Sequence, residues 1–252
     1  RRIGFTGGEP FLRGDLETIV NYSRSKGIFT GITSNGILAV TEQRILEQLD
    51  LLILSLDGPP SVQDLHRGKG AYHAVVELLE RLPSEKLALS CVLYAQSLEH
   101  IDHVLDLAKR FSVRLHVQPV AAITLMNNQV DNYLPEKEMY EQVIDYLIEV
   151  HDQVPLLNSV SSLRYLRAHP YQEPIACPAG KIFFRISANG SLYSCYRQEN
   201  DAGISIVEHG LDEALYRVHE PVCSGCTIAD GVELSRIHQL NLGALVHAFR
   251  VA

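Results

Sequence analysis

The sequence predicts an α/β protein: a partial (β/α)6 TIM-like barrel, truncated at its N-terminus, followed by a small cysteine-rich α+β appendage. Short apolar runs alternate with amphipathic helical segments over residues 3–120, and strands joined by helices pair in parallel through right-handed crossovers. Four of the five cysteines fall within residues 177–226. The chain begins with Arg1 and enters a strand almost at once, so we interpret it as a fragment without its first βα unit.

The barrel is expected to contain five strands, each a short apolar run: residues 3–5, 29–32, 51–54, 87–93 and 114–117. Helices are expected near residues 15–26, 42–49, 72–82 and 98–110. In the last of these, apolar residues recur at three- and four-residue spacing, which is typical of a helix with one buried face. These elements predict a barrel domain at 1–125, a helical connector at 126–172 with no further strand, and the appendage at 173–252.

Composition limits the classes of function. The chain has 252 residues, of which 46% are hydrophobic and 21% charged, as in an ordinary globular protein. A net charge of −8 argues against nucleic-acid partners and against anionic membrane surfaces. No apolar run approaches the ~18 residues that a membrane span requires. An odd number of cysteines, two of them in Cys223-Ser-Gly-Cys226, disfavours a secreted disulfide framework and indicates a cytoplasmic protein.

Polar residues follow all five predicted strands. Because parallel strands present their C-terminal ends on one face, these residues predict a ligand site there. A polar turn accounts for any single strand end, but five around one opening favour a ligand. Glycines at positions 7 and 8 allow the backbone to approach a ligand closely, and the Glu9 carboxylate can accept hydrogen bonds from an ammonium group. The strand-end segments are Thr6-Gly7-Gly8-Glu9, Thr33-Ser34-Asn35-Gly36, Ser55-Leu56-Asp57-Gly58, Tyr94-Ala95-Gln96 and Gln118-Pro119.

Gly7-Gly8-Glu9-Pro10 after a strand resembles the S-adenosylmethionine (SAM) motif of radical SAM enzymes, and the next two strand ends resemble the corresponding segments of that family. The resemblance implies that Gly7, Gly8 and Glu9 hold the methionyl amino group. It also implies that the carboxylate and ribose lie near the second and third strand ends, with the last strand closing over the adenosine. The implied cofactor-binding residues are Gly7, Gly8, Glu9, Pro10, Ser34, Asn35, Ser55 and Gln118.

The segment His66-Arg67-Gly68 resembles the Arg-Gly loop of the same family, where Arg67 would pair with an anionic group or anchor the loop through a salt bridge. Asp57, Arg67 and Tyr94 are candidate catalytic residues, without an assigned acid or base. Radical SAM enzymes also carry a Cys-x3-Cys-x2-Cys loop that binds the SAM-cleaving [4Fe–4S] cluster. None of the five cysteines has this spacing, so we expect that loop upstream of Arg1.

The appendage begins with Cys177. Strands at 183–186 and 192–195 flank the turn residues Asn189 and Gly190, which predict a hairpin, and a helix follows near 211–218. Cys-x12-Gly-x4-Cys followed by Cys-x2-Cys resembles the Twitch appendage, the short form of the SPASM extension, and implies an auxiliary [4Fe–4S] cluster. Its ligands would be Cys177, Cys195, Cys223 and Cys226, whereas Cys91 is predicted to be a buried apolar residue within a strand.

Three functions remain open. The resemblance implies an enzyme that generates a 5′-deoxyadenosyl radical from SAM and abstracts hydrogen from a small molecule, which it oxidises or rearranges. Flavodoxin or ferredoxin would donate electrons, and a cluster with four cysteine ligands would relay electrons rather than bind substrate. The same parts would serve a peptide-modifying (RiPP-type) maturase. Four thiolates can also bind zinc, so the third hypothesis is a non-catalytic barrel with a structural zinc site.

Overall fold

A computed structural model of the chain describes residues 1–120, 133–169, 173–196, 203–221, 223 and 225–251. The chain divides into two compact units. Unit 1 comprises residues 1–120 with 132–157, and unit 2 comprises residues 121–131 with 158–252. This division differs from the predicted boundaries, because the described helices of the predicted connector are shared between the two units: α7 (Lys137–Glu149) lies in unit 1 and α8 (Val160–Leu166) in unit 2.

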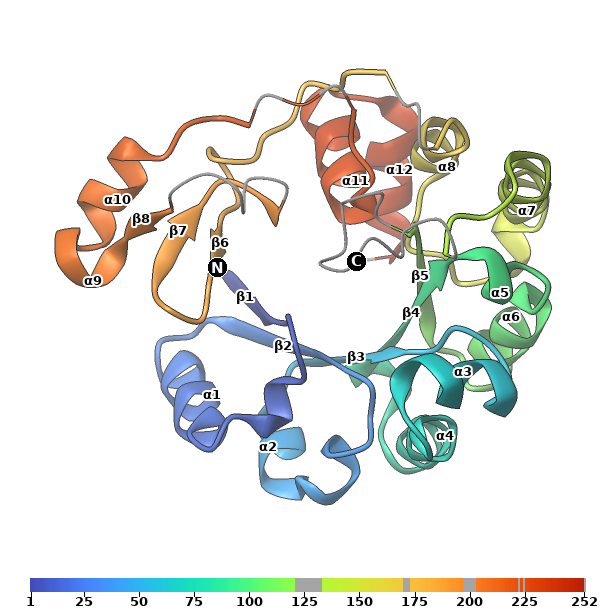
Figure 1. Cartoon of the computed structure of the whole chain (residues 1–252), viewed down its shortest axis with the longest axis horizontal. Coiled ribbons are helices and arrows are strands. Elements are labelled where there is room, and N and C mark those ends of the chain that lie inside the picture. Colours follow the sequence, from blue (N-terminus) through green and yellow to red (C-terminus); the bar gives the residue numbers. More distant parts are fainter. Residues whose placement is uncertain (121–132, 170–172, 197–202, 222, 224, 252) are drawn as a thin grey trace. The chain divides into compact units, whose positions relative to one another are not determined.

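Unit 1 is built on a five-stranded parallel sheet, as the sequence predicts. Its strands are β1 (Arg2–Phe5), β2 (Phe29–Ser34), β3 (Leu51–Ser55), β4 (Leu87–Leu93) and β5 (Arg114–Pro119). They pair in chain order, β1-β2-β3-β4-β5. The strands follow an arc with the helices of unit 1 on its outer side (Figure 1). Since all strands are parallel, their C-terminal ends lie along one edge of this arc.

The helices of unit 1 connect successive strands. They are η1 (Pro10–Leu12), α1 (Leu16–Ser25), η2 (Ala39–Thr41), α2 (Gln43–Gln48), α3 (Pro60–Arg67), α4 (Ala71–Arg81), η3 (Ser84–Lys86), α5 (Ala95–Leu98), α6 (Ile101–Arg110), α7 and η5 (His151–Gln153). Helix α3 was not predicted, because the consecutive prolines Pro59 and Pro60 are typical of a turn. Pro60 instead occupies the first helical turn, where no N–H is needed. The predicted Arg-Gly loop is therefore corrected: Arg67 ends a helix, and Gly68, with φ +102°, caps it.

After α7 the chain returns to the sheet at the free edge of β5. Leu156 forms an isolated parallel bridge with Leu115. The Leu115 N–H donates to Pro155 O at 2.9 Å, and the Leu157 N–H donates to Leu115 O at 2.7 Å. No strand lies among the described residues 133–169, as the sequence predicts, and this pairing is an isolated bridge. A bridge this short has no apolar run long enough to be read as a strand in the sequence.

The core of unit 1 lies between the central strands and the helices outside them. Leu54, Leu87 and Leu89 have 0% exposed surface, and α6 buries Val104 fully against the sheet. Burying one such side chain contributes about 1.5–3 kcal/mol. Cys91, within β4, is also fully buried, as predicted for an apolar position.

Unit 2 contains a three-stranded antiparallel sheet and helices, in the order α8, β6 (Arg185–Ile186), β7 (Ser191–Tyr193), β8 (Ile204–Ser205), α9 (Ile206–His209), α10 (Leu211–Arg217), α11 (Ala229–His238) and α12 (Leu242–Val251). The predicted hairpin is present, and Gly190 in its turn has φ +81°, which favours glycine. Helices α11 and α12 were not predicted. Among the described residues, no helix combines the length and apolar character needed to cross a bilayer.

Candidate functional site

The Glu9 carboxylate links the ends of β1 and β2. The Ser34 hydroxyl donates to Glu9 Oε1 at 3.0 Å, and the Asn35 N–H donates to Oε2 at 3.1 Å. The Phe11 N–H also donates to Oε1, at 3.2 Å. All three groups donate hydrogen bonds to the Glu9 carboxylate, which is thereby held in place. The structure therefore brings together three of the predicted site residues.

The two glycines before Glu9 leave the backbone open. Gly7 has φ +121°, a conformation that favours glycine. A Cβ added at Gly7 or Gly8 would meet no atom within 4 Å, so a ligand can reach this backbone. Pro10 then starts η1, which turns the chain away from the strand.

The side chain of Asn35 joins β2 to the end of α3. Its Nδ2 donates to Arg67 O at 3.2 Å, and its Oδ1 accepts from the Ile37 N–H at 3.0 Å. The Ser34 hydroxyl likewise accepts from the Gly36 N–H at 3.0 Å. The loop after β2 is thus held by side chains that the sequence analysis assigned to ligand binding.

Asp57 and Arg67 form an ion pair beside the same strand ends. Asp57 is fully buried, and its Oδ2 lies 2.7 Å from Arg67 Nε, while its Oδ1 accepts from the Val92 N–H at 2.9 Å. Burial alone would lower the pKa of Arg67, but the Asp57 carboxylate outweighs it and raises that pKa. The carboxylate therefore ties the end of α3 to β4 and keeps the guanidinium charged.

Gln63 is a site residue that the sequence analysis missed. It is fully buried on α3; its Nε2 donates to Ser55 O at 2.7 Å, and its Oε1 accepts from the Asp57 N–H at 2.8 Å. It thereby fixes the backbone that follows β3. A buried glutamine could have been recognised only if α3 had been recognised first.

Tyr94, after β4, stacks edge-on against His66, with ring centroids 4.6 Å apart, and against Tyr133 at 6.3 Å. Burial, reinforced by Asp57, raises the pKa of Tyr94, and burial lowers the pKa of His66. Both side chains are therefore neutral at pH 7. Tyr94 Oη and His66 Nε2 are buried without a hydrogen-bond partner among the described residues. Gln118 lies on β5, paired in register with Val92.

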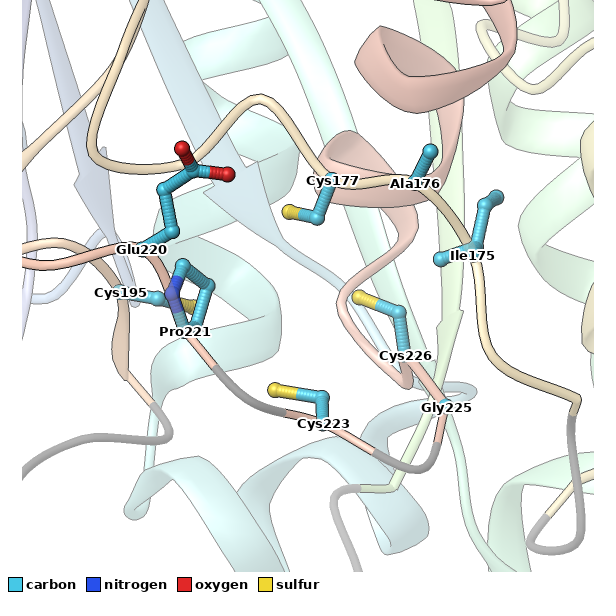
Figure 2. A pocket seen from close by; sticks show the side chains of 9 residues that line it. All are labelled: Ile175, Ala176, Cys177, Cys195, Glu220, Pro221, Cys223, Gly225 and Cys226. Carbon is cyan, nitrogen blue, oxygen red and sulfur yellow. The ribbon is translucent and has the colours of Figure 1, made fainter.

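Unit 2 gathers four cysteines around one cavity of about 240 Å³ (Figure 2). In the figure, the sulfur atoms of Cys177, Cys223 and Cys226 extend into a common space, and Cys195 lies behind Pro221. Cys195 and Cys226 are buried, whereas Cys223 is exposed. Burial first, and then the other three thiols, raise the pKa of Cys226 to about 11. The four predicted metal ligands are thus close enough to interact electrostatically.

The cavity suits a group with several atoms. Across the described ranges, no set of three or more His, Cys, Asp or Glu side chains is placed to hold a single metal ion. Thiolates are the ligands that iron–sulfur clusters take. Thiol donors around a cavity of about 240 Å³ are compatible in chemistry and size with an iron–sulfur cluster.

No protein-family model matches the chain. Among curated proteins it is similar to the mycofactocin maturase MftC of Mycolicibacterium smegmatis, at 27% identity, over 77% of this chain and 51% of that protein. It is also similar to a probable GTP 3′,8-cyclase of Sulfurisphaera tokodaii, at 26% identity, over 87% of this chain and 75% of that protein. The chain spans about half the length of the maturase.

Solved structures show the same fold. Streptococcus suis SuiB bound to S-adenosylmethionine matches with a TM-score of 0.64 at 18% identity, over 87% of this chain and 55% of SuiB. A structure of anSMEcpe with bound AdoMet and a peptide matches with a TM-score of 0.59 at 17% identity, over 86% of this chain and 67% of anSMEcpe. These relatives and structural neighbours are radical SAM enzymes, and the chain has the parallel α/β fold of their structures.

Proposed function

We propose that this chain forms the SAM site and an auxiliary [4Fe–4S] site of a radical SAM enzyme. The observation that carries the proposal is the Glu9 carboxylate, fixed by Ser34 and Asn35 beside open glycine backbone at the C-terminal edge of a parallel sheet. A carboxylate held rigidly at such an edge is complementary to the ammonium group of SAM. When bound, SAM and its reducing cluster supply the 5′-deoxyadenosyl radical, and the protein supplies placement.

Each strand end has a role in this proposal. Gly7 and Gly8 admit the methionyl group, and Glu9 accepts from its ammonium. Ser34 and Asn35 keep the Glu9 carboxylate oriented. Ser55 and Gln118, on β3 and β5, are the proposed contacts of the ribose and adenosine, and Pro10 directs the chain out of the site.

Among the candidate catalytic residues, Asp57 is proposed as a positioning residue. Both of its carboxylate oxygens are engaged and none of its surface is exposed, so it acts by holding Arg67. The Arg67 side chain is 29% exposed and keeps its charge for an anionic group. Tyr94 and His66 are proposed as neutral groups that hydrogen-bond a ligand. Tyr94 Oη and His66 Nε2 are available for this because neither has a hydrogen-bond partner among the described residues.

The auxiliary cluster is proposed to be held by Cys177, Cys195, Cys223 and Cys226, in a Twitch-like unit. What supports it is the convergence of these four thiols on one cavity of about 240 Å³. With a cysteine on every iron there is no open coordination position, so the bound cluster would supply electron transfer rather than Lewis acidity. A single zinc ion is the alternative, and iron and acid-labile sulfide analysis separates the two.

A peptide is the proposed substrate class. The named relatives support it: one is a maturase, SuiB has been solved with its precursor peptide SuiA, and anSMEcpe with a peptide. A small molecule is the second candidate, favoured by the similarity to the probable GTP 3′,8-cyclase over 87% of this chain. Mass spectrometry of reactions offered candidate precursor peptides or nucleotides, with flavodoxin or ferredoxin as electron donor, distinguishes them.

The SAM site is tested with Glu9→Gln in protein expressed from the complete gene and reconstituted anaerobically. Replacing one carboxylate oxygen by an amide removes a charge-assisted hydrogen bond worth about 1.5–3 kcal/mol, so SAM affinity should fall by roughly 10–100-fold. Glu17→Gln, on the exposed face of α1, is the matched control and should bind SAM like the wild type. Equal SAM affinity of the Glu9 variant and the wild type would refute the proposed site.

A further inference from the structure

The hydroxyl of Tyr165 connects the two segments that carry Cys177 and Cys226. On α8, Tyr165 Oη accepts a hydrogen bond from the Cys226 N–H at 3.0 Å and donates one to Glu173 O at 2.5 Å. Glu173 lies four residues before Cys177. One phenol group thereby bridges the backbone at one thiol and the segment leading to another, with both its donor and an acceptor site in use.

The ring of Tyr165 packs against a cation and a buried apolar cluster. The guanidinium of Arg236, on α11, lies 5.2 Å from the centroid of its ring. The ring also packs on a buried cluster of Leu166, Cys226, Ala229 and Val232.

A carboxylate joins α8 to α11. Glu233 Oε2 accepts from the Ser159 N–H at 3.1 Å and from the Ser159 hydroxyl at 3.0 Å. Ser159 is the N-cap of α8 and also accepts from the Ser162 N–H. Because α11 begins three residues after Cys226, this carboxylate fixes the helix that carries Tyr165 relative to the helix that follows the thiol.

The Cys226 thiol is placed by the same contacts. Its Sγ lies 3.6 Å from Ile228 O, and a Cβ added at Gly231 would come within 3.4 Å of the sulfur. Gly231 therefore allows the first turn of α11 to approach the thiol closely. These contacts place the sulfur beside the start of α11.

We propose that Tyr165 is a positioning residue for the auxiliary cluster, which holds the backbone of Cys226 and the segment of Cys177 in the arrangement that the cluster requires. The inference rests on the proposed function, since it assumes that the four thiols bind iron and sulfide. Groups that orient metal ligands through hydrogen bonds typically contribute 10–100-fold to metal affinity, and hydrogen bonding near the sulfurs also sets the reduction potential of a cluster.

Tyr165→Phe tests this role, because it removes the hydroxyl and keeps the ring that stacks on Arg236. Tyr216→Phe is the matched control: it removes a tyrosine hydroxyl from α10 of the same unit, where the side chain is 87% exposed. Protein from the complete gene is reconstituted with iron and sulfide and then challenged with a chelator. Retained iron and sulfide are measured together with the reduction potential of the auxiliary cluster and the thermal midpoint of the apoprotein.

We expect Tyr165→Phe to bind the cluster about 10–100-fold less tightly and with a shifted potential, while Tyr216→Phe behaves like the wild type. Wild-type cluster retention and potential in Tyr165→Phe would overturn the inference. So would a loss of iron that comes with an unchanged potential and a collapsed apoprotein midpoint, because that result indicates a role in folding alone. If wild-type unit 2 takes up no iron and sulfide, the proposed auxiliary cluster itself fails, and the inference fails with it.

Discussion

Removing the Asp57 carboxylate should destabilise unit 1 strongly. Asp57→Ala leaves the part-buried Val92 N–H without its acceptor, at a cost of about 1–3 kcal/mol, and deprives Arg67 of a charge-assisted hydrogen bond worth about 1.5–3 kcal/mol. Part of the second loss is recovered because water reaches the Arg67 side chain, which is 29% exposed. We therefore expect the free energy of unfolding to fall by about 3–5 kcal/mol, as for other broken buried pairs.

Asp57→Asn separates the two contributions. The amide oxygen can still accept from the Val92 N–H, while the amide NH2 faces Arg67 Nε and cannot accept from it, so we expect a smaller loss of about 1–3 kcal/mol. Glu80→Ala, at an exposed position of α4, is the control and should stay within about 0.5 kcal/mol of the wild type. Urea titration followed by far-ultraviolet circular dichroism measures all three. An Asp57→Ala protein within about 1 kcal/mol of the wild type would refute the anchoring role.

Three further predictions concern titratable groups and thiols. Because burial holds the folded-state pKa of His66 below its unfolded value, its contribution to stability is present above about pH 6.5 and is lost as the pH falls toward the folded pKa. His66→Gln should therefore lose less unfolding free energy than the wild type between pH 7.5 and about pH 5.5, and an equal loss in urea titrations would contradict this. In the apoprotein at about pH 8, iodoacetamide should alkylate exposed Cys223 at least ~10-fold faster than buried Cys226, whose pKa is raised to about 11. Peptide mass spectrometry measures both rates. Equal rates would contradict the burial of Cys226. Cys177→Ser should reduce bound iron after reconstitution, whereas Cys91→Ala, inside β4, should leave it unchanged. Unchanged bound iron in Cys177→Ser would remove Cys177 from the ligand set.

The regular part of the fold could be predicted from sequence, because its signals are local. The strand predicted at 87–93 matches β4 (Leu87–Leu93), where almost every residue is apolar, one face is buried and the other is at least half-buried. The helices α3 and α11 were missed for physical reasons. Consecutive prolines at the start of α3 are typical of a turn, and α11 contains Gly231 within its first turn, where a glycine weakens the helical signal.

The candidate site was predicted in its residues but not in its contacts. Glu9, Ser34 and Asn35 were each assigned to SAM, yet the bonds among them join residues at least 25 positions apart and depend on the register of β1 and β2. The pairing of Asp57 with Arg67 depends in the same way on helix α3, which has to form before the guanidinium can reach the carboxylate. Long-range contacts of this kind leave no periodic trace in the sequence.

The most direct test of the central claim is the amount of iron and acid-labile sulfide bound by residues 1–252 after anaerobic reconstitution. The account predicts about four iron and four sulfide per chain, both lost when the four cysteines of unit 2 are replaced by serine. About one zinc per chain with no sulfide would contradict it.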